Sequence, residues 1–348
     1  MTDEIMRIGP KEVGGSVIVV AEAGVNHNGN LKRALRMVDE AAKSGADAIK
    51  FQTFHTEKVV SQDAPKAEYQ KRTSRGKTQL EMLRNLELSQ ADFMTISRRA
   101  RTRGIVFLST AFDRESADFL DSLGVPAFKI GSGELTNLPF LEHVARKGKP
   151  LILSTGMSYL EEVRDAVSAI RGQGNEKIVL LHCVSSYPAN PADANLKAMQ
   201  TLRDAFSVPV GFSDHTLGTE IAIAAAALGA VLIEKHFTLS RTLQGPDQKA
   251  SLEPSEFAQM VRGIRLAEKA QGSGVKAPTK EEEKMRFIAR RSIVSSVDIP
   301  EGQSINEKMV DFKRPGTGIP PKDVQLLLGK RAARDIKRDE VLTWDMVE

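Results

Sequence analysis

Short apolar segments rich in β-branched residues recur along most of the chain, and a segment with helical spacing follows each of them. Leu31–Ser44 and Leu160–Arg171, for example, read as amphipathic helices. Alternation of strands and helices indicates a parallel sheet, and eight such units in about 250 residues match a closed (β/α)₈ TIM barrel. The eight apolar runs are Val17–Gly24, Ala48–Phe54, Val106–Phe112, Ala127–Gly133, Leu151–Gly156, Ile178–Cys183, Pro209–His215 and Val231–Thr238.

An open, doubly wound sheet is the alternative to the barrel. That fold favours a Gly-rich phosphate-binding turn after an early strand. Here the first apolar run is followed by Gly24-Val25-Asn26-His27-Asn28-Gly29, which lacks the GxGxxG spacing. The sequence therefore favours the barrel.

The composition and the residue pattern of the chain change after the last helical segment of the barrel. A cluster of Gly, Ser, Pro and charged residues is typical of a linker. Beyond it, Arg291–Val297 alternates like a strand and Arg314–Gly318 is a Gly/Pro turn. We expect a barrel over residues 1–272, a linker over 273–284 and a small β-rich domain over 285–348. A module this small has little core of its own and is expected to lean on a partner surface.

Composition limits the kinds of partner. The formal net charge is +4, and the basic residues alternate with acidic ones, so we expect no binding of nucleic acid. The polar start Met1–Pro10 lacks the apolar core of a signal peptide. The most apolar stretch, Ile221–Ile233, is too short for a membrane span. Cys183 is the one cysteine, which excludes an internal disulfide, and we expect a cytoplasmic protein.

Polar side chains stand near the carboxyl ends of nearly all the predicted strands, where the active sites of such barrels lie. Several of them are two residues apart and therefore share a strand face, as in Lys50 and Gln52, or Glu234 and His236. Burying so many polar groups without partners or ligands is costly. The set therefore predicts a single polar site at the mouth of the barrel.

Two histidines, His215 and His236, end the seventh and eighth runs. Neighbouring barrel strands bring such side chains together, and neutral imidazoles suit divalent transition metals. Two protein ligands leave open positions for water or substrate oxygens, as Lewis-acid catalysis requires. His182 with Cys183 is a weaker alternative metal pair.

Lysines and hydroxyls at the strand ends supply donors for a phosphate and a carboxylate. This donor set is Lys50, Lys129, Lys235, Ser109, Thr110, Ser132, Ser154 and Ser213. A rival hypothesis makes one lysine a Schiff-base nucleophile with a depressed pKa. The carboxylates of Glu22, Glu134 and Asp247 are candidates for binding sugar hydroxyls or moving protons.

These motifs resemble the sialic acid synthase family, the enzymes that condense phosphoenolpyruvate with amino sugars to form nonulosonates. The matching segments run in order along nearly the whole chain. They are Glu22–His27, Lys50–Thr53, Ser109–Phe112, Lys129–Glu134, Leu153–Met157, His182-Cys183, Tyr187-Pro188, Gly211–Leu217, Glu234–Thr238 and Gly245–Asp247. The tail, with Lys313–Gly316 and Leu328–Lys330, resembles the antifreeze-like (SAF) domain of the same enzymes.

The resemblance implies roles for particular residues. His215 and His236 match the two histidines that bind the metal ion in this family. The ion is expected to be manganese, with magnesium or cobalt as alternatives. The positions that match contacts to phosphoenolpyruvate are Lys50, Thr110, Lys129, Ser132, Ser154, Ser185 and Ser213; those on the amino-sugar side are Gln52, Glu134, Tyr187 and Asp247. Some relatives carry asparagine where this chain has Ser185. The serine side chain is the shorter of the two and reaches less far toward a phosphate. The resemblance also implies a domain-swapped homodimer in which Arg314 reaches the partner's barrel.

The activity implied is a metal-assisted condensation of phosphoenolpyruvate, an open-chain N-acetylated amino sugar and water to give a sialic-type acid and phosphate. We assign His215 and His236 to the metal and Glu22 to the attacking water. The acceptor is N-acetylmannosamine or a close analogue; the alternative is the diacetamido trideoxy sugar that gives a legionaminic-type acid. A Schiff-base pyruvate aldolase and an ice- or ligand-binding module are further alternatives, and the second of these requires neither the two histidines nor the lysine cluster of the barrel.

Overall fold

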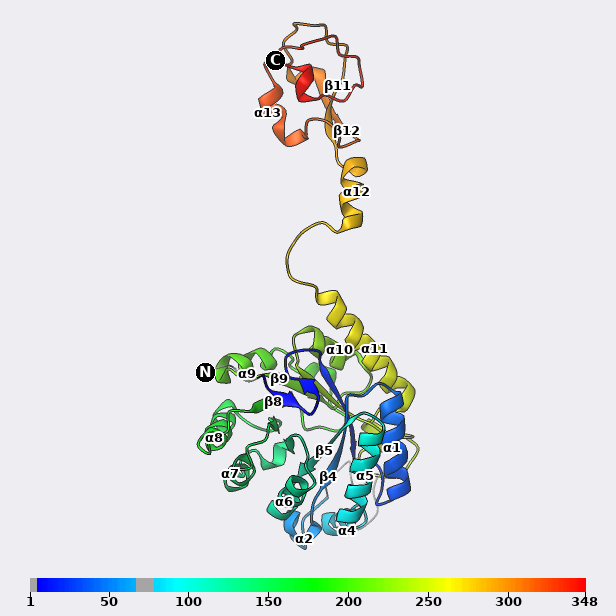
Figure 1. The fold of residues 1–348 in the computed structure, drawn as a ribbon, viewed down its shortest axis with the longest axis vertical. Coiled ribbons are helices and arrows are strands. Elements are labelled where there is room, and N and C mark those ends of the chain that lie inside the picture. Colours follow the sequence, from blue (N-terminus) through cyan, green and yellow to red (C-terminus); the bar gives the residue numbers. More distant parts are fainter. Residues whose placement is uncertain (1–4, 67–77) are drawn as a thin grey trace. The chain divides into compact units, whose positions relative to one another are not determined.

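Residues 5–66 and 78–348 are described in the computed structural model, and the chain divides into two compact units, Met1–Gly272 and Ser273–Glu348. In the first unit, eight parallel strands close into a barrel in the order β10-β3-β4-β5-β6-β7-β8-β9 (Figure 1). The barrel strands are β3 (Ile18–Gly24), β4 (Ala48–Thr53), β5 (Val106–Ala111), β6 (Phe128–Ile130), β7 (Leu151–Ser154), β8 (Ile178–Cys183), β9 (Val210–Asp214) and β10 (Leu232–His236). The predicted (β/α)₈ barrel is therefore confirmed.

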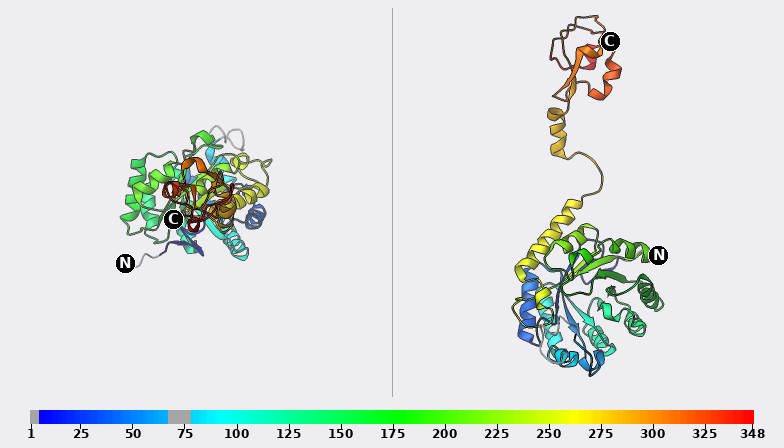
Figure 2. Two further views of the ribbon diagram at one scale, coloured as in Figure 1. Left: turned by 90° about the horizontal axis from the view of Figure 1, so that it is seen from above. Right: turned by 180° about the vertical axis from the view of Figure 1, so that it is seen from behind.

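Helices surround the barrel on its outside, as both side views show (Figures 1 and 2). They are α1 (Leu31–Lys43), α2 (Thr56–Val59), α4 (Gln79–Arg84), α5 (Gln90–Thr102), α6 (Arg114–Ser122), α7 (Leu138–Ala145), α8 (Leu160–Arg171), α9 (Ala198–Phe206), α10 (Glu220–Ala227) and α11 (Pro254–Gln271). Local signals start several of them: the Asn30 side chain accepts the Arg33 N–H at the start of α1, and Ser89 and Asp92 form a capping box on α5. No helix in the described ranges is long and apolar enough to cross a membrane.

Side chains alternate strictly between the two faces of the barrel strands. On β10, Leu232 packs in the interior apolar cluster, whereas Ile233 packs in the outer cluster between strands and helices. The same alternation places Val20, Ala48, Leu108 and Val179 inside. The inner apolar layer lies toward the amino ends of the strands, and on every strand except β8 the next inward position carries a polar group. The sequence alternation thus sets which polar residues enter the barrel.

The amino end of the barrel is closed by ion pairs and by a small hairpin of β1 (Arg7–Ile8) and β2 (Lys11–Glu12). Asp47, directly before β4, accepts the Val19 backbone N–H and pairs with Lys11 at 2.5 Å and with Arg265 of α11 at 2.5 Å. This network lies at the end of the barrel opposite the carboxyl ends of the strands.

The second unit contains the antiparallel pair β11 (Ser292–Ser295) and β12 (Val310–Lys313), with α12 (Lys280–Ala289) and the short α13 (Val324–Leu327). It has its own buried cluster, which includes Ile293, Ile319 and Leu342. Apolar residues spaced through turns, and not only through strands, converge into this cluster, which is small beside that of the barrel. Helix α12 begins inside the range that we expected to be a linker.

Short 3₁₀ helices complete the description. Their bounds are η1 (Ser132–Glu134), η2 (Pro191–Asp193), η3 (Gln248–Ala250), η4 (Glu307–Met309), η5 (Pro321–Asp323) and η6 (Trp344–Met346).

Candidate active site

A ring of charged and polar side chains fills the barrel interior toward the carboxyl ends of the strands. It combines two lysines with two glutamates, and serine and threonine hydroxyls lie between them. The members are Glu22, Lys50, Thr110, Lys129, Ser154, Ser213 and Glu234, all of them buried. Seven of the eight barrel strands contribute one inward side chain each to this ring, whereas the inward residues of β8 at this level, Leu181 and Cys183, are not charged.

Lys50 lies between two carboxylates in this ring. Its Nζ is 2.8 Å from Oε2 of Glu22 and 3.6 Å from Oε2 of Glu234, and it donates to the Thr110 hydroxyl at 2.8 Å. Gln52, two residues further along β4, donates to Oε1 of Glu22 at 3.3 Å. Lys50 is therefore held by partners that an incoming anion would compete with.

Lys129 occupies the neighbouring side of the ring. It donates to the Ser154 hydroxyl at 2.7 Å, and its Nζ is 3.7 Å from Oε1 of Glu234. The same carboxyl oxygen accepts the Ser213 hydroxyl at 3.0 Å. Glu234 thus faces both lysines, a central role that its position among the polar strand ends did not reveal.

The two glutamates differ widely in pKa. Burial raises the pKa of Glu22 to about 7, with Glu234 adding to the rise and Lys50 opposing it. Burial also acts on Glu234, but Lys129 and Lys50 outweigh it and lower its pKa to about 2. For Lys50, burial is outweighed by Glu22 and Glu234, which raise its pKa; for Lys129, burial prevails and lowers the pKa.

His215 and His236 come together at the carboxyl side of the ring, with ring centroids 5.5 Å apart. Burial lowers the pKa of both, so both are neutral near pH 7. Nδ1 of His215 lies 2.7 Å from the Val184 carbonyl oxygen; because a carbonyl only accepts, Nδ1 carries the proton and Nε2 keeps its lone pair. Nδ1 of His236 is buried without a hydrogen-bond partner among the described residues. These donors fit a divalent transition metal.

A pocket opens beside His236 and includes three of the residues predicted for the sugar: Gln52, Tyr187 and Asp247. The Tyr187 ring lies 4.3 Å from the His215 ring, centroid to centroid. Burial raises the pKa of Asp247 to about 6. The rest of the wall is largely apolar and comes from the loops after β3, β4 and β5, from α2 and α4, and from the turn after α4. Those residues are Val25, Phe54, Val59, Met82, Leu83, Leu86 and Phe112.

The turn after β7 brings a backbone amide against three polar side chains. The Gly156 N–H donates to the Ser132 hydroxyl at 3.0 Å, and that hydroxyl lies 3.2 Å from Sγ of Cys183. A β-carbon at Gly156 would lie 2.3 Å from the Ser185 hydroxyl oxygen. Residues 132, 156 and 185 therefore form one small cradle; Gly156 was missed as a site residue, although it follows a strand that ends in Ser154.

Three residues that the sequence placed in or near the site point away from it. Lys235 and Ser109 occupy outward positions: Lys235 pairs with Asp214, and Ser109 shares a hydrogen bond of 2.7 Å with Thr53. His182 also faces outward, with Nε2 2.9 Å from the Ala194 carbonyl oxygen, whereas its neighbour Cys183 faces inward. The prediction of Lys235 and Ser109 as donors was wrong, and His182 with Cys183 cannot share a metal ion.

Two further predicted residues lie on other segments. Glu134 in η1 accepts the Asn137 side-chain amide at 2.7 Å. Arg314 is exposed on the second unit, directly after β12. Contact of either residue with a substrate stays a prediction.

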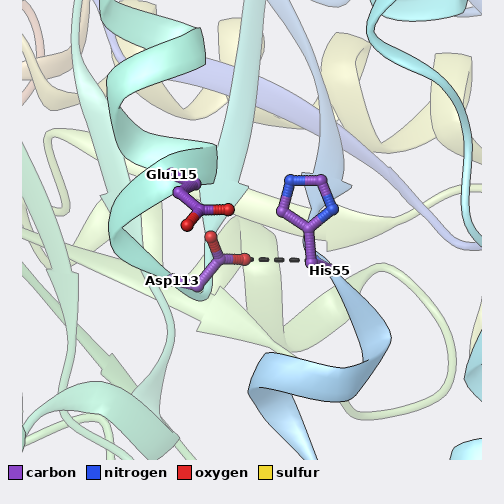
Figure 3. A group of neighbouring side chains, drawn as sticks. All are labelled: His55, Asp113 and Glu115. Carbon is purple, nitrogen blue, oxygen red and sulfur yellow. Dashed lines mark hydrogen bonds between the residues drawn. The ribbon is translucent and has the colours of Figure 1, made fainter.

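A separate group of possible ligands, His55, Asp113 and Glu115, was not anticipated from the sequence (Figure 3). Asp113 accepts the backbone N–H of His55 at 3.0 Å and of Ser116 at 2.8 Å, the second as the N-cap of α6. Glu115 pairs with Lys58 and is largely exposed. Asp113 and Glu115 therefore stabilise the loops between β4 and α2 and between β5 and α6.

The fold is that of a (β/α)₈-barrel enzyme, and lysines, hydroxyls and two neutral histidines lie inside the barrel toward the carboxyl ends of its strands. Comparison with known proteins then places it: the chain belongs to the NeuB family, whose model matches residues 37–276, and it carries a SAF domain over residues 290–348. The resemblance to the sialic acid synthase family that the sequence motifs indicate is therefore confirmed.

Relatives cover nearly the full chain. An N,N'-diacetyllegionaminic acid synthase of Legionella pneumophila is 47% identical over 99% of this chain and 98% of the relative. One of the same name from Campylobacter jejuni is 46% identical over 93% of this chain and 98% of the relative. The crystal structure of an N-acetylneuraminic acid synthetase from Leptospira borgpetersenii matches with a TM-score of 0.73 and 37% identity, over 81% of this chain and 94% of the other.

Proposed function

We propose that this enzyme joins phosphoenolpyruvate to an open-chain N-acetylated amino sugar, with water, to give a nonulosonic acid and phosphate, assisted by a divalent metal ion. The observation that carries the proposal is the interior ring. It holds two lysines and several hydroxyl donors directly below two neutral histidines. The names of the relatives, which are acid synthases of this kind, support the same reaction class.

The charge of the ring favours an anionic ligand. Near pH 7 the pKa values leave Glu234 ionised and Glu22 partly protonated, so the two lysines are not fully balanced by carboxylates. Unbalanced buried charge is costly, and a phosphate or carboxylate group relieves that cost. We assign the anionic ends of phosphoenolpyruvate to Lys50, Lys129 and the neighbouring hydroxyls of Thr110, Ser154 and Ser213. The cradle of Ser132, Gly156 and Ser185 adds further donors.

His215 and His236 would hold the divalent ion, manganese by preference with magnesium or cobalt as alternatives. When bound, such an ion supplies Lewis-acid polarisation of the sugar aldehyde. The protein's own part is to keep both imidazoles neutral by burial and to fix the tautomer of His215 through the Val184 carbonyl.

The remaining chemistry requires positioning and one proton acceptor. The methylene carbon of phosphoenolpyruvate forms the new C–C bond with the aldehyde carbon, whose oxygen gains a proton. Water adds to the phosphate-bearing carbon that becomes positive and loses a proton, and the C–O bond to phosphate then breaks. The ring orients the first substrate and excludes bulk water, while Tyr187, Gln52 and Asp247 line the acceptor pocket. We assign this proton, from the attacking water, to Glu22, whose pKa is near 7.

The apolar wall of the pocket favours the diacetamido trideoxy acceptor over N-acetylmannosamine. Phe54, Met82 and Phe112 offer no hydrogen bonds to an extra sugar hydroxyl, whereas they pack against methyl groups. Such a difference is worth about 1–3 kcal/mol, or roughly 10–200-fold in kcat/KM. The two relatives of 46% and 47% identity are named for the legionaminic-type product, which supports this choice.

The test is phosphate release from phosphoenolpyruvate with each sugar, in Mn²⁺ and in EDTA. We expect metal-dependent release, faster with the diacetamido sugar. His236→Ala should lose metal-dependent turnover, whereas His143→Ala, at a partly exposed histidine of α7 paired with Asp118, should retain it. Release with neither sugar by a folded protein would refute the proposed reaction, and equal rates would refute the proposed acceptor.

The Schiff-base alternative has a definite candidate in Lys129, because burial lowers the pKa of that lysine. An aldolase of this kind would use free pyruvate, ignore EDTA and be trapped covalently by borohydride. Borohydride labelling of Lys129 in the presence of pyruvate would favour that reaction over the one proposed.

A further inference from the structure

A charged residue precedes each of the two site histidines, and the two charges meet on the outer face of the barrel. Asp214 ends β9 directly before His215, and Lys235 stands on β10 directly before His236. Asp214 and Lys235 are register partners in the sheet, with Nζ 2.7 Å from Oδ2. Both side chains are 0% exposed. The pair therefore connects the two strand ends that carry the histidines.

The pair also holds the chain on both sides of His215. Oδ1 of Asp214 accepts the backbone N–H of Thr216 at 2.9 Å and its hydroxyl at 2.8 Å. Lys235 donates to the Thr216 carbonyl oxygen at 2.6 Å. Residues 214 and 216 are thus tied to β10, and the backbone of His215 lies between two anchored neighbours.

Stability alone is a weak reason for such a pair. The cost of removing two charges from water roughly cancels their attraction, and apolar residues of similar size are often as stable in such a place. The surroundings here are apolar, since Phe212 and Ile233 on the same outward faces belong to the main core. The pair instead adds geometric specificity, because it fixes the spacing and the orientation of the ends of β9 and β10.

We propose that Asp214 and Lys235 form a positioning clamp that holds the imidazoles of His215 and His236 at the separation required to share one divalent cation. This inference rests on the proposed metal site. The clamp contacts neither substrate nor metal; it acts through the histidines, as the residues that orient metal ligands generally do.

The test measures Mn²⁺ binding to the metal-free, full-length protein without substrates, by electron paramagnetic resonance titration. Lys235→Met and Asp214→Asn should each raise the Kd for Mn²⁺ by about 10–100-fold, the usual effect of removing such a supporting partner. Lys235→Arg, which keeps the charge, should lose less. The matched control is Arg265→Met, which removes an ion pair with Asp47 at the opposite end of the same barrel and should leave the Kd unchanged.

A second readout does not require metal. The imidazole ¹⁵N resonances of His215 and His236 in the metal-free protein should shift or broaden in Lys235→Met and Asp214→Asn, and stay in place in Arg265→Met. If Lys235→Met does not fold, the Asp214→Asn variant tests the clamp. It should still fold, because its amide oxygen can accept the same two hydrogen bonds from Thr216. Folded clamp variants with unchanged Kd and unchanged resonances would overturn the proposal. A wild-type protein that binds no Mn²⁺ would instead refute the proposed metal site, and the resonances would still decide the clamp.

Discussion

Glu22 and Glu234 lie in the same buried ring and both face Lys50, yet burial and charge separate their pKa values to about 7 and about 2. The difference comes from Lys129, which stands beside Glu234, and from the Ser213 hydroxyl that Glu234 accepts. Two carboxyl groups whose environments push their pKa values apart are suited to different tasks. Glu234 serves as a constant counter-ion, and Glu22 is able to change its protonation near neutral pH.

The pH dependence of turnover follows from Glu22. Below pH 7 its carboxyl group is protonated and cannot accept a proton, so kcat for phosphate release should fall by about tenfold for each pH unit and level off above pH 7. Glu22→Gln should lower kcat by roughly 10²–10⁴-fold and lose this acid limb. Glu12→Gln, on the exposed β2 strand, is the control. An unchanged acid limb in Glu22→Gln would contradict the assignment.

His27 determines part of the acid stability. Burial, followed by the nearby charge of Arg33, lowers the pKa of His27 to about 4 from its ordinary value of 6.5. Between those values the unfolded chain binds the proton and the folded chain does not, so stability falls as the pH drops from 6.5 through 4. The loss attributable to this residue is at most about 3 kcal/mol.

The variant His27→Asn removes the titrating imidazole. The asparagine side-chain oxygen is able to accept the Gly29 N–H that Nδ1 of His27 accepts in the wild type. The difference in free energy of unfolding between pH 7 and pH 4.5, from urea titrations, should shrink in His27→Asn. Thr102→Asn, at an exposed and non-titrating position of α5, should give the wild-type difference. An equal pH dependence in wild type and His27→Asn would show that His27 does not carry this effect.

At the scale of the strands, the two-residue period decides how much of the site the sequence predicts. Lys50, Lys129 and Ser154 were placed correctly inside the barrel because each continues the inward phase of its own strand. Lys235 was grouped with them only because it lies near the end of a strand. Its neighbours Glu234 and His236 share the inward face, so the residue between them has to face outward, and the same phase argument applies to Ser109 beside Thr110.

Contacts between loops carry no such period. The acceptor pocket joins Val25, Phe112 and Asp247 with helix α4, and the Gly156 cradle joins the turns after β6, β7 and β8. These segments are far apart in the chain, so no local pattern reports which of their side chains meet. The central position of Glu234 was missed for the same reason: its inward face was readable from the sequence, but its two lysine partners come from other strands.

The turn after β7 gives a prediction at this scale. In Gly156→Ala the new methyl group would lie 2.3 Å from the Ser185 oxygen, 2.8 Å from Sγ of Cys183 and 2.9 Å from the Ser132 oxygen, so the cradle has to widen. We expect KM for phosphoenolpyruvate to rise at least about tenfold, a cost of about 1.4 kcal/mol in binding, with the barrel still folded. Gly15→Ala, whose nearest contact is 3.5 Å, is the control in steady-state kinetics. A normal KM in Gly156→Ala would exclude the cradle from substrate binding.

At the scale of the whole molecule, each of the two units has its own apolar core. A protein truncated before Met285 should therefore fold as a barrel, with far-ultraviolet circular dichroism and cooperative melting like those of the full chain. If Arg314 contributes to the site, this barrel should release little phosphate from phosphoenolpyruvate. Full activity of the truncated barrel would refute any role of the second unit in turnover.

Whether Arg314 acts on its own barrel or on that of a partner is decided by mixing two inactive proteins. In a symmetric dimer with an exchanged domain, a heterodimer of Arg314→Ala and His236→Ala contains one site with both an intact His236 and an intact Arg314. Co-expression at equal levels should then restore about a quarter of the wild-type phosphate release, since half of the dimers are mixed and each has one complete site. If Arg314 serves its own chain, no dimer has a complete site and the mixture stays inactive. Each variant purified alone provides the baseline, and an active Arg314→Ala protein would remove Arg314 from the site altogether.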